Sequence, residues 1–347
     1  MKSTKGHSMR LRHSLITIAA AMGLIFSSTT AASAADLTGS GSSFAFKYIT
    51  ACKASSGHNV TYSSTGSGTG RNNFNDGVTD FGASDAASAL SKATGKYLYI
   101  PVVGGPISVL YNVPEAKTQL KLDAPTLAKI LRGSIDRWND GAIGVLNPGV
   151  KLPNKPIIVV YRSASSGTTE NITDYLNKVA PKEWPKVKNG TFTSATPSMP
   201  RGAKGAANAQ VLASTVRSTK YAIGYADLSD AISSKMPFAS MKNENGEFVS
   251  PTPEAAAKFL GDFDKADPLT GVTIDFTKKV AGGYNMSLFT YAIAPKAGGV
   301  KPGTNAPAVK ELVDHLLTKC KDGTALGYSQ ISGNLLTAAK ALVDQIS

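Results

Sequence analysis

A short stretch that begins at Arg162 combines an arginine with hydroxyl side chains and a glycine, residue types that suit anion binding. It follows the apolar run 156–161 and precedes residues 168–179, whose apolar side chains fall at helical spacing, so a strand is expected to turn sharply into a helix here. The first N–H groups of a helix have no acceptor within the helix, and the helix dipole favours negative charge at that end. A planar, permanently charged guanidinium adds a fork suited to a tetrahedral oxyanion. The stretch Arg162-Ser163-Ala164-Ser165-Ser166-Gly167-Thr168 therefore predicts an oxyanion site.

Two more turns of this type lie closer to the N-terminus. The expected strands 37–38 and 59–62 run into the Gly/Ser-rich stretches 39–44 and 64–70, and a helical segment follows each of them. Gly/Ser turns are frequent in α/β proteins, so one alone says little, but three of them with an arginine favour an anion site. The donors that they offer are the hydroxyls of Ser43, Ser67, Ser166 and Thr168 and the backbone N–H groups of Phe44 and Gly167.

Asp85 ends a third expected strand, residues 80–85, and would discriminate between anions. A carboxylate beside a bound anion is repulsive unless the anion carries a proton that it can donate. Phosphate near neutral pH carries one or two protons, whereas sulfate carries none, so an acceptor in a site built of donors would reject sulfate. The alternative is that Asp85 only caps the turn at residues 86–88. The sequence leaves both interpretations open.

The strand–turn–helix order occurs three times, which predicts an α/β protein with an open sheet and a ligand at the carboxyl ends of its strands. The apolar runs 97–103 and 107–113 are expected to be two strands joined by a Gly-Gly-Pro turn, the second of them crossing between lobes. Residues 189–205 are expected to be a loop too long for a simple connector. The remaining expected elements are helices at 71–76, 122–131, 208–218, 309–320 and 335–346 and strands at 221–225 and 287–294, the last being the return crossover.

Residues 1–35 have the features of a cleaved signal peptide. Four cations precede an apolar run at 15–26, and a small-residue Ala-x-Ala site follows it. The apolar run is too short for a membrane anchor, which needs about 20 residues, and no cysteine at the cleavage point offers a lipid attachment site. We therefore expect an exported mature chain of about 310 residues, long enough for two lobes.

Charge and cysteine content narrow the class of protein further. The net charge is +13, and removal of the four signal-peptide cations leaves +9. Lys and Arg are dispersed and no basic–aromatic stripe occurs, so we expect a basic surface that attracts small anions rather than a nucleic-acid site. Cys52 and Cys320 are expected to form a disulfide, as cysteine pairs in exported proteins usually do. The histidines lack zinc-site spacing, so no metal or other cofactor is expected.

Enzyme classes find little support in the motifs. Residues 66–70 lack the Gly-x-Gly-x-x-Gly spacing of a dinucleotide loop, and no Gly-Lys-Ser/Thr loop occurs. The Gly-x-Ser-x-Gly frame of a serine hydrolase is missing around Ser67, and His315 lies on an apolar helix flank where packing is a better explanation than catalysis. A metal-dependent phosphatase would need clustered Asp and His. We therefore expect a binding protein without catalytic residues.

Eight segments resemble, in chain order, the signature segments of the periplasmic phosphate-binding proteins of Pst ABC transporters. They are residues 38–44, 65–70, 80–85, 102–105, 130–138, 146–149, 162–168 and 222–225. The resemblance implies the type II periplasmic-binding-protein fold, with two α/β lobes joined by a two-crossover hinge. Lobe 1 would comprise residues 36–112 and 286–347, and lobe 2 residues 113–285. The family's phosphate ligands map onto Ser43, Phe44, Ser67, Asp85, Arg162, Ser166, Gly167 and Thr168.

The same resemblance implies a function. We expect a periplasmic monomer that binds inorganic phosphate and passes it to the membrane permease subunits of an ABC importer. The sequence alone leaves two alternatives open. One is a binder of another oxyanion, such as sulfate or a phosphonate. The other is an exported phosphate scavenger or adhesion protein that works without a transporter.

The chain departs from the family pattern beside the arginine. The family usually has an aspartate two residues after it, whereas this chain has Ala164, with Ser165 in place of the usual glycine. The arginine would then be less restrained and the site more positive, which would alter affinity or selectivity against sulfate. Glu170, one helical turn further on, is a candidate substitute for the missing partner of Arg162.

Overall fold

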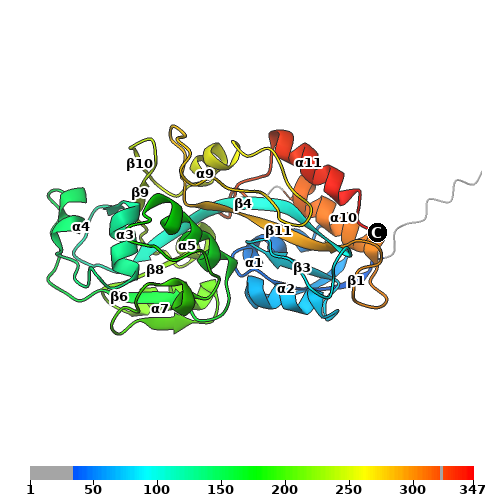
Figure 1. The fold of residues 1–347 in the computed structure, drawn as a ribbon, viewed down its shortest axis with the longest axis horizontal. Coiled ribbons are helices and arrows are strands. Elements are labelled where there is room, and N and C mark those ends of the chain that lie inside the picture. The colour runs from blue at the N-terminus through cyan, green and yellow to red at the C-terminus, as the bar shows by residue number, and fades with distance from the viewer. Residues whose placement is uncertain (1–33, 321–322) are drawn as a thin grey trace, which may run out of the picture. The chain divides into compact units, whose positions relative to one another are not determined.

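The computed structural model describes residues 34–320 and 323–347, and the predicted signal peptide lies outside this part except for its last two residues (Figure 1). Residues Ala34–Ser347 form one compact unit. No helix in the described ranges is long and apolar enough to cross a membrane.

One mixed sheet runs through this unit, with the strand order β2-β1-β3-β11-β4-β8-β6-β7. Its strands are β1 (Asp36–Gly41), β2 (Asn59–Ser63), β3 (Phe81–Ser84), β4 (Tyr97–Tyr111), β6 (Ile158–Arg162), β7 (Lys204–Ala206), β8 (Ala222–Asp227) and β11 (Ser287–Pro295). A small second sheet has the order β10-β9-β5 and consists of β5 (Lys121–Leu122), β9 (Ser240–Lys242) and β10 (Phe248–Val249).

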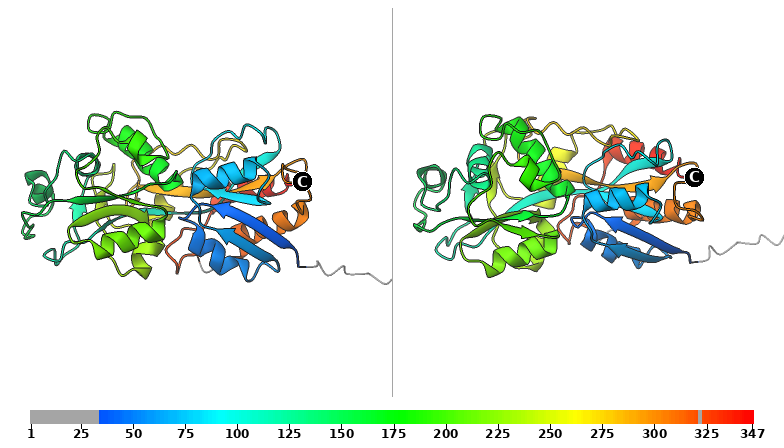
Figure 2. Two further views of the ribbon diagram at one scale, coloured as in Figure 1. Left: turned by 90° about the horizontal axis from the view of Figure 1, so that it is seen from below. Right: turned by 60° about the horizontal axis from the view of Figure 1, so that its bottom comes forward.

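Helices lie on both sides of the large sheet (Figure 1 and Figure 2). Several begin with a side chain that accepts a hydrogen bond from the first turn, such as Asp123, Ser166 and Asn208. The helices are α1 (Phe46–Lys53), α2 (Ser67–Asn75), α3 (Ala124–Leu131), α4 (Gly141–Leu146), α5 (Gly167–Val179), α6 (Phe192–Ala195), α7 (Ala209–Ser218), α8 (Leu228–Ser233), α9 (Pro253–Leu260), α10 (Ala306–Asp314) and α11 (Gly333–Val343), with a π-helical turn at His315–Lys319.

The pairing of the strands divides the large sheet into two halves that share β4. Strand β1 is parallel to both β2 and β3, and β6 is parallel to both β7 and β8. The long β4 pairs antiparallel with β11 over residues 97–106 and with β8 over residues 107–111. We call β2, β1, β3 and β11 the first half-sheet and β8, β6 and β7 the second half-sheet. Because parallel strands end at the same edge, the loops after β1, β2 and β3 open on one side.

The prediction of two strands joined by a turn at residues 104–106 is wrong, because β4 is continuous through them. Gly104 and Gly105 stay in register with Phe289 and Leu288 of β11. Added Cβ atoms would come within 2.6 Å of Leu260 and 3.1 Å of Phe44, respectively. These glycines therefore allow close packing on the strand rather than a turn.

Three smaller predictions also need correction. Helix α2 begins at Ser67 rather than at residue 71, so the second Gly/Ser turn is itself the first turn of a helix. The long loop 189–205 contains the short helix α6 and the start of the edge strand β7. The single helix expected at 309–320 is α10 followed by the π-helical turn.

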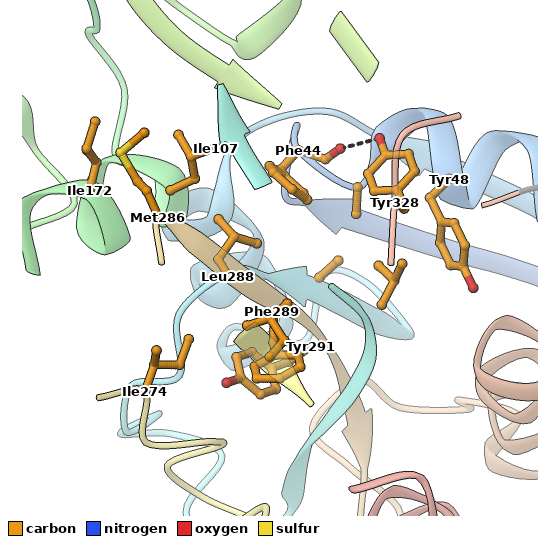
Figure 3. Packing of buried hydrophobic residues seen from close by; sticks show 14 of the residues in the cluster. Phe44, Tyr48, Ile107, Ile172, Ile274, Met286, Leu288, Phe289, Tyr291 and Tyr328 are labelled. Atoms are coloured by element: carbon orange, nitrogen blue, oxygen red, sulfur yellow. Dashed lines mark hydrogen bonds between the residues drawn. The ribbon is translucent and has the colours of Figure 1, made fainter. Parts of the chain in front are cut away.

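Buried side chains from distant parts of the chain pack together around β4 and β11 (Figure 3). The hydroxyl of Tyr328 donates to the carbonyl of Phe44 at 2.6 Å. The predicted disulfide between Cys52 and Cys320 is confirmed, with its Cα atoms 5.4 Å apart. The C-terminal segment is thus fastened to α1, which follows the first Gly/Ser turn.

Candidate functional site

Main-chain hydrogen bonds tie together the loops that leave the first half-sheet. The N–H of Gly66 donates to the carbonyl of Gly41 at 2.8 Å, and the N–H of Ser42 donates to the carbonyl of Ala83 at 2.8 Å. The three loops that follow β1, β2 and β3 consequently present Ser43, Ser67 and Asp85 at one edge of the sheet. Arg162 ends β6 of the second half-sheet and faces them.

The guanidinium of Arg162 joins the two half-sheets. Its Nη1 donates to the Oγ of Ser43 at 2.9 Å and to the Oγ of Ser166 at 3.0 Å, and its Nη2 donates to the carbonyl of Ala207 at 3.1 Å. The side chain is only 2% exposed. Within the described ranges it forms no ion pair, and its Nε has no hydrogen-bond acceptor. An intact positive charge is thus buried among neutral oxygens.

The electrostatic setting of Arg162 makes it receptive to an anion. Burial lowers the pKa of the guanidinium, while Tyr225 and the carboxylates of Asp85, Asp227 and Asp230 raise it. A buried charge without a direct partner carries a desolvation penalty of several kcal/mol. An anion that reached this guanidinium would relieve that penalty through charge-assisted hydrogen bonds.

Asp85 contributes a carboxylate to this cluster, and hydroxyls surround it. Its Oδ1 accepts from Ser42 at 2.5 Å and from Thr290 at 2.7 Å. Its Oδ2 has longer contacts, with Ser67 at 3.3 Å and with Thr168 at 3.4 Å. The two oxygens are therefore unequal, since Oδ1 is firmly held and Oδ2 has the weaker bonds.

The protonation of Asp85 depends on two opposing effects. Burial raises the pKa of the carboxyl, and the hydrogen bonds from Ser42, Thr290 and Ser67 lower it, as does the charge of Arg162. Hydrogen bonds donated by hydroxyls stabilise the ionised form. The alternative that Asp85 merely caps residues 86–88 is wrong, because no helix follows there and its carboxylate accepts from side chains instead.

Backbone donors complete the cluster. In the part of the chain that the structure describes, the N–H groups of Phe44, Ser67, Gly167 and Thr168 donate to no protein acceptor. The N-cap of α5 pairs the N–H that follows those of Gly167 and Thr168, since the Oγ of Ser166 accepts from the N–H of Thr169 at 3.3 Å. Buried backbone donors in proteins are nearly always paired. Four unpaired ones beside a buried arginine are typical of an anion site.

Gly167, the first residue of α5, packs closely against the loops that leave the first half-sheet. A Cβ atom at this position would be 2.6 Å from the Oγ of Ser67 and 2.7 Å from the Cβ of Asp85. Real Cβ contacts are longer than this, so any other residue would force the two sides apart. The N–H of Gly68 also donates across the junction, to the carbonyl of Ser165 at 3.4 Å.

All eight predicted site residues lie in this region and are buried. Phe44 differs from the others, because its ring packs edge-on against Tyr328 at a centroid distance of 5.7 Å and only its backbone can serve a ligand. The suggestion that Glu170 replaces the missing partner of Arg162 is wrong. Its Oε2 lies 3.5 Å from Arg71 of α2 instead.

Ser42 and Thr290 are the residues of the site that sequence reasoning missed. Ser42 lies directly before a predicted ligand, so its neighbourhood gave a signal. Thr290 is separated from Asp85 by 205 positions and lies in an apolar strand. Only the antiparallel pairing of β11 with β3 brings the two together, with Tyr291 opposite Ser84.

A pocket of about 310 Å³ adjoins the cluster on one side of Asp85. Its lining includes Glu170 and Asn171 of α5 and Tyr291 of β11. The side-chain amide of Asn171 donates to the carbonyl of Asp85 at 2.6 Å. Among the described residues, no group of three or more His, Cys, Asp or Glu side chains is placed to hold a metal ion.

The fold and this cluster define a class of proteins. Residues 27–319 match the PBP superfamily domain. A phosphate-binding protein called PfluDING, solved with phosphate bound, has the same fold with a TM-score of 0.69 at 21% identity, covering 88% of this chain and 93% of that one. A phosphate-binding protein from Stenotrophomonas maltophilia gives a TM-score of 0.67 at 19% identity, with the same coverage. The predicted type II periplasmic-binding-protein fold is confirmed.

Sequence relatives narrow this class to one family. The chain is 39% identical over 226 residues to the phosphate-binding protein PstS of Pasteurella multocida, and the match spans 63% of this chain and 64% of that relative. It is 36% identical over 279 residues to PstS of Methanocaldococcus jannaschii, spanning 75% of this chain and 71% of that relative. The chain therefore belongs to the PstS phosphate-binding protein family of the PBP superfamily. The relatives carry the names of binding proteins, not of enzymes.

Proposed function

We propose that this protein binds inorganic phosphate between its two half-sheets and delivers it to the membrane permease subunits of an ABC importer. The observation that carries the proposal is the convergence of a buried, unpaired arginine and four unpaired backbone N–H groups around a single carboxylate. This donor set suits a tetrahedral oxyanion, and the carboxylate suits one that still carries a proton. The names of the family members support the same ligand.

Each proposed ligand residue has a defined role. Arg162 supplies charge and two parallel donors to the phosphate oxygens. Ser43, Ser67, Ser166 and Thr168 supply hydroxyls, whereas Phe44 and Gly167 supply backbone N–H groups. Asp85 accepts the proton that phosphate carries and sulfate lacks.

Closure around the ligand follows from the division of these residues between two lobes. We place Ser43, Phe44, Ser67 and Asp85 in lobe 1 (residues 36–112 and 286–347) and the remaining four in lobe 2 (113–285). The bonds from Arg162 to Ser43 and from Thr168 to Asp85 span the two lobes. A ligand that contacts both lobes would favour the closed form, with β4 and β11 as the crossovers of the hinge.

The remaining parts of the proposal concern the protein's setting. We propose that residues 1–35 direct export and are removed, and that the mature chain works in the periplasm as a monomer without enzymatic activity. Coupling to a transporter is tested by the uptake of labelled phosphate in cells that lack this protein. Unchanged uptake at low external phosphate would instead favour a scavenger or an adhesion protein.

Calorimetric titration of the mature chain tests the ligand directly. We expect one phosphate per chain, similar binding of arsenate because it has the same shape and protonation, and no binding of sulfate. A chain that bound sulfate or a phosphonate in preference to phosphate would support a binder of another oxyanion. Turnover of a phosphate ester would contradict the absence of enzymatic activity.

A further inference from the structure

Thr290 contacts the proposed discriminating carboxylate, although it lies outside the predicted ligand set. Its Oγ1 donates to the Oδ1 of Asp85 at 2.7 Å, and both residues are buried. Thr290 belongs to β11, which forms ladders with β3 and β4, so its position is fixed by the centre of the sheet. Ser42 donates to the same oxygen at 2.5 Å from the loop after β1.

The hydroxyls of Thr290 and Ser42 both donate to Oδ1 of Asp85. Oδ1 therefore accepts two short hydrogen bonds, whereas Oδ2 has only longer contacts. Oδ2 has only the contacts of 3.3 Å with Ser67 and 3.4 Å with Thr168, and both of these residues are proposed phosphate ligands. If their hydroxyls turn toward a bound phosphate, Oδ2 becomes the free acceptor for the proton of the ligand. Oδ1 cannot take this role while two short bonds hold it.

We propose that Thr290, together with Ser42, is a positioning residue that makes Asp85 select a protonated oxyanion. The pair aims Oδ2 at the ligand and stabilises the ionised carboxylate, which repels an anion without a proton. This inference rests on the proposed function, because it assumes that phosphate occupies the site. It adds a specificity-determining residue that lies behind the ligand shell rather than in it.

The energetics support a role for these hydroxyls in ionisation. Asp85 is 3% exposed and forms no ion pair among the described residues, so hydroxyl donors are its main direct stabilisation. Burial raises the pKa of Asp85, and Ser42 and Thr290 are the two leading groups that lower it. Removing one of them would shift the carboxyl toward its neutral form. A neutral carboxyl can donate to sulfate, so discrimination would weaken.

Other charged and titratable groups face Asp85 as well. They are Arg162 of β6, Tyr62 of β2 and Tyr291 of β11 and, around the adjoining pocket, Glu170, Asp174, Lys178 and Lys188. All of them are present in both the wild type and a variant at Thr290. A difference in pH profile between the two proteins therefore reports on Asp85.

The test is a pH series of phosphate and sulfate titrations with the Thr290→Val chain. We expect phosphate affinity to fall about tenfold near pH 7.5, as for the loss of one hydrogen bond to a charged group. We expect sulfate binding to appear and to strengthen as the pH is lowered to about 5.5, so that the phosphate-to-sulfate ratio falls at least about tenfold. Thr290→Ser keeps the hydroxyl and should restore the wild-type ratio.

Thr196→Val is the matched control. Thr196 is also buried and donates from its Oγ1, to the carbonyl of Ser198 at 2.6 Å, but it contacts none of the proposed ligands. It should leave the ratio and its pH dependence unchanged. If the Thr290→Val chain does not fold, as judged by circular dichroism, Ser42→Ala provides the same test.

The results distinguish a failure of the proposed function from a failure of the proposal for Thr290. A wild-type chain that does not bind phosphate would overturn the proposed function itself. A wild-type chain that binds phosphate, with variants at Thr290 or Ser42 that keep its selectivity at every pH, would overturn only this inference. Phosphate binding that weakens by the same factor at every pH, with no gain of sulfate binding, would also overturn it, because it would indicate a merely structural role.

Discussion

Strand β3 has an aspartate at each end, and the two buried carboxylates have different partners. Asp80, before the strand, accepts from Lys301 at 2.8 Å and from the N–H and hydroxyl of Thr38 at 2.8 and 2.7 Å. Asp85, after the strand, is surrounded by hydroxyls and has no ion-pair partner among the described residues. One carboxylate is neutralised by the protein. The other is left to interact with a ligand.

The pKa shifts of the two aspartates have opposite signs for this reason. Burial acts to raise the pKa of Asp80, but the bonds from Lys301 and Thr38 outweigh it and the pKa is lowered. Burial dominates at Asp85, and its pKa is raised. The comparison shows that a direct cation makes a carboxylate a structural element. A carboxylate held only by hydroxyls remains sensitive to the proton of a ligand.

The largest expected effect on phosphate binding comes from removing the guanidinium of Arg162, which lies on the Asp85 side of β3. We expect Arg162→Ala to weaken phosphate binding by about 3 kcal/mol, which is more than a hundredfold, because charge-assisted hydrogen bonds in a buried site are lost. The loss should exceed that of any single serine change. Calorimetry on Arg162→Ala and Ser67→Ala tests this ranking, and equal losses for the two would contradict it. Arg132→Ala is the control, because Arg132 caps the end of α3 and donates to the carbonyl of Glu183 at 2.7 Å.

A smaller effect is expected from neutralising Asp85. Asp85→Asn should weaken phosphate binding about tenfold and strengthen sulfate binding, since an amide can donate where the carboxylate could only accept. Asp80→Asn is the matched control and should change neither affinity more than about twofold, because Asp80 contacts no proposed ligand. Competition titrations with the two anions measure the shift. Selectivity that stayed at the wild-type level in Asp85→Asn would refute the role of Asp85.

The free energy of unfolding should depend on Asp80 more than on Asp85, the reverse of the order expected for ligand binding. Asp80→Asn should lower the free energy of unfolding at pH 7 by about 2 kcal/mol, because Lys301 loses its partner. The lowered pKa of Asp80 means that its contribution is present above the ordinary value of 3.8 and is lost as the pH falls through the folded value. Urea unfolding at pH 7 and at pH 3 should therefore show a smaller deficit at pH 3 than at pH 7. A deficit that grew at low pH would have the wrong sign.

Urea unfolding of Asp85→Asn should give a different result from that of Asp80→Asn. A raised folded pKa means that the carboxyl favours the folded state below 3.8 and loses this contribution as the pH rises through the folded value. Asn does not ionise, so Asp85→Asn should not lower the free energy of unfolding at pH 7. A strong destabilisation at that pH would show that Asp85 is a structural residue like Asp80.

The smallest effect is expected from an ion pair that spans the proposed lobes. The Nζ of Lys47 lies 2.5 Å from the Oδ1 of Asp230 and donates to the carbonyl of Ser229 at 2.9 Å. Lys47→Gln should weaken phosphate binding about threefold by disfavouring the closed form. Lys92→Gln is the control, because it removes an exposed pair with Asp76 within one lobe. Equal phosphate affinities of Lys47→Gln and Lys92→Gln would show that Lys47 does not stabilise the closed form.

The sequence allowed the local parts of this site to be predicted. Gly/Ser turns and strand–helix order identified the loops after β1, β2 and β6, since turn chemistry depends on neighbours in the chain. Asp85 was found because it ends a strand. The pairing of Thr290 with Asp85 and of Glu170 with Arg71 depends on strand order and packing, for which single residue types give no signal. Gly104 and Gly105 were misread because glycine suits both turns and close packing.

We propose that Asp85 discriminates between anions by accepting the proton of its ligand, and a competition titration with phosphate and sulfate measures this discrimination. The mature wild-type chain is titrated with phosphate at about pH 8, once without sulfate and once in a large excess of sulfate at matched ionic strength. We predict the same phosphate affinity in both titrations, because the ionised carboxylate rejects sulfate. A phosphate affinity that falls in proportion to the sulfate concentration would contradict this account.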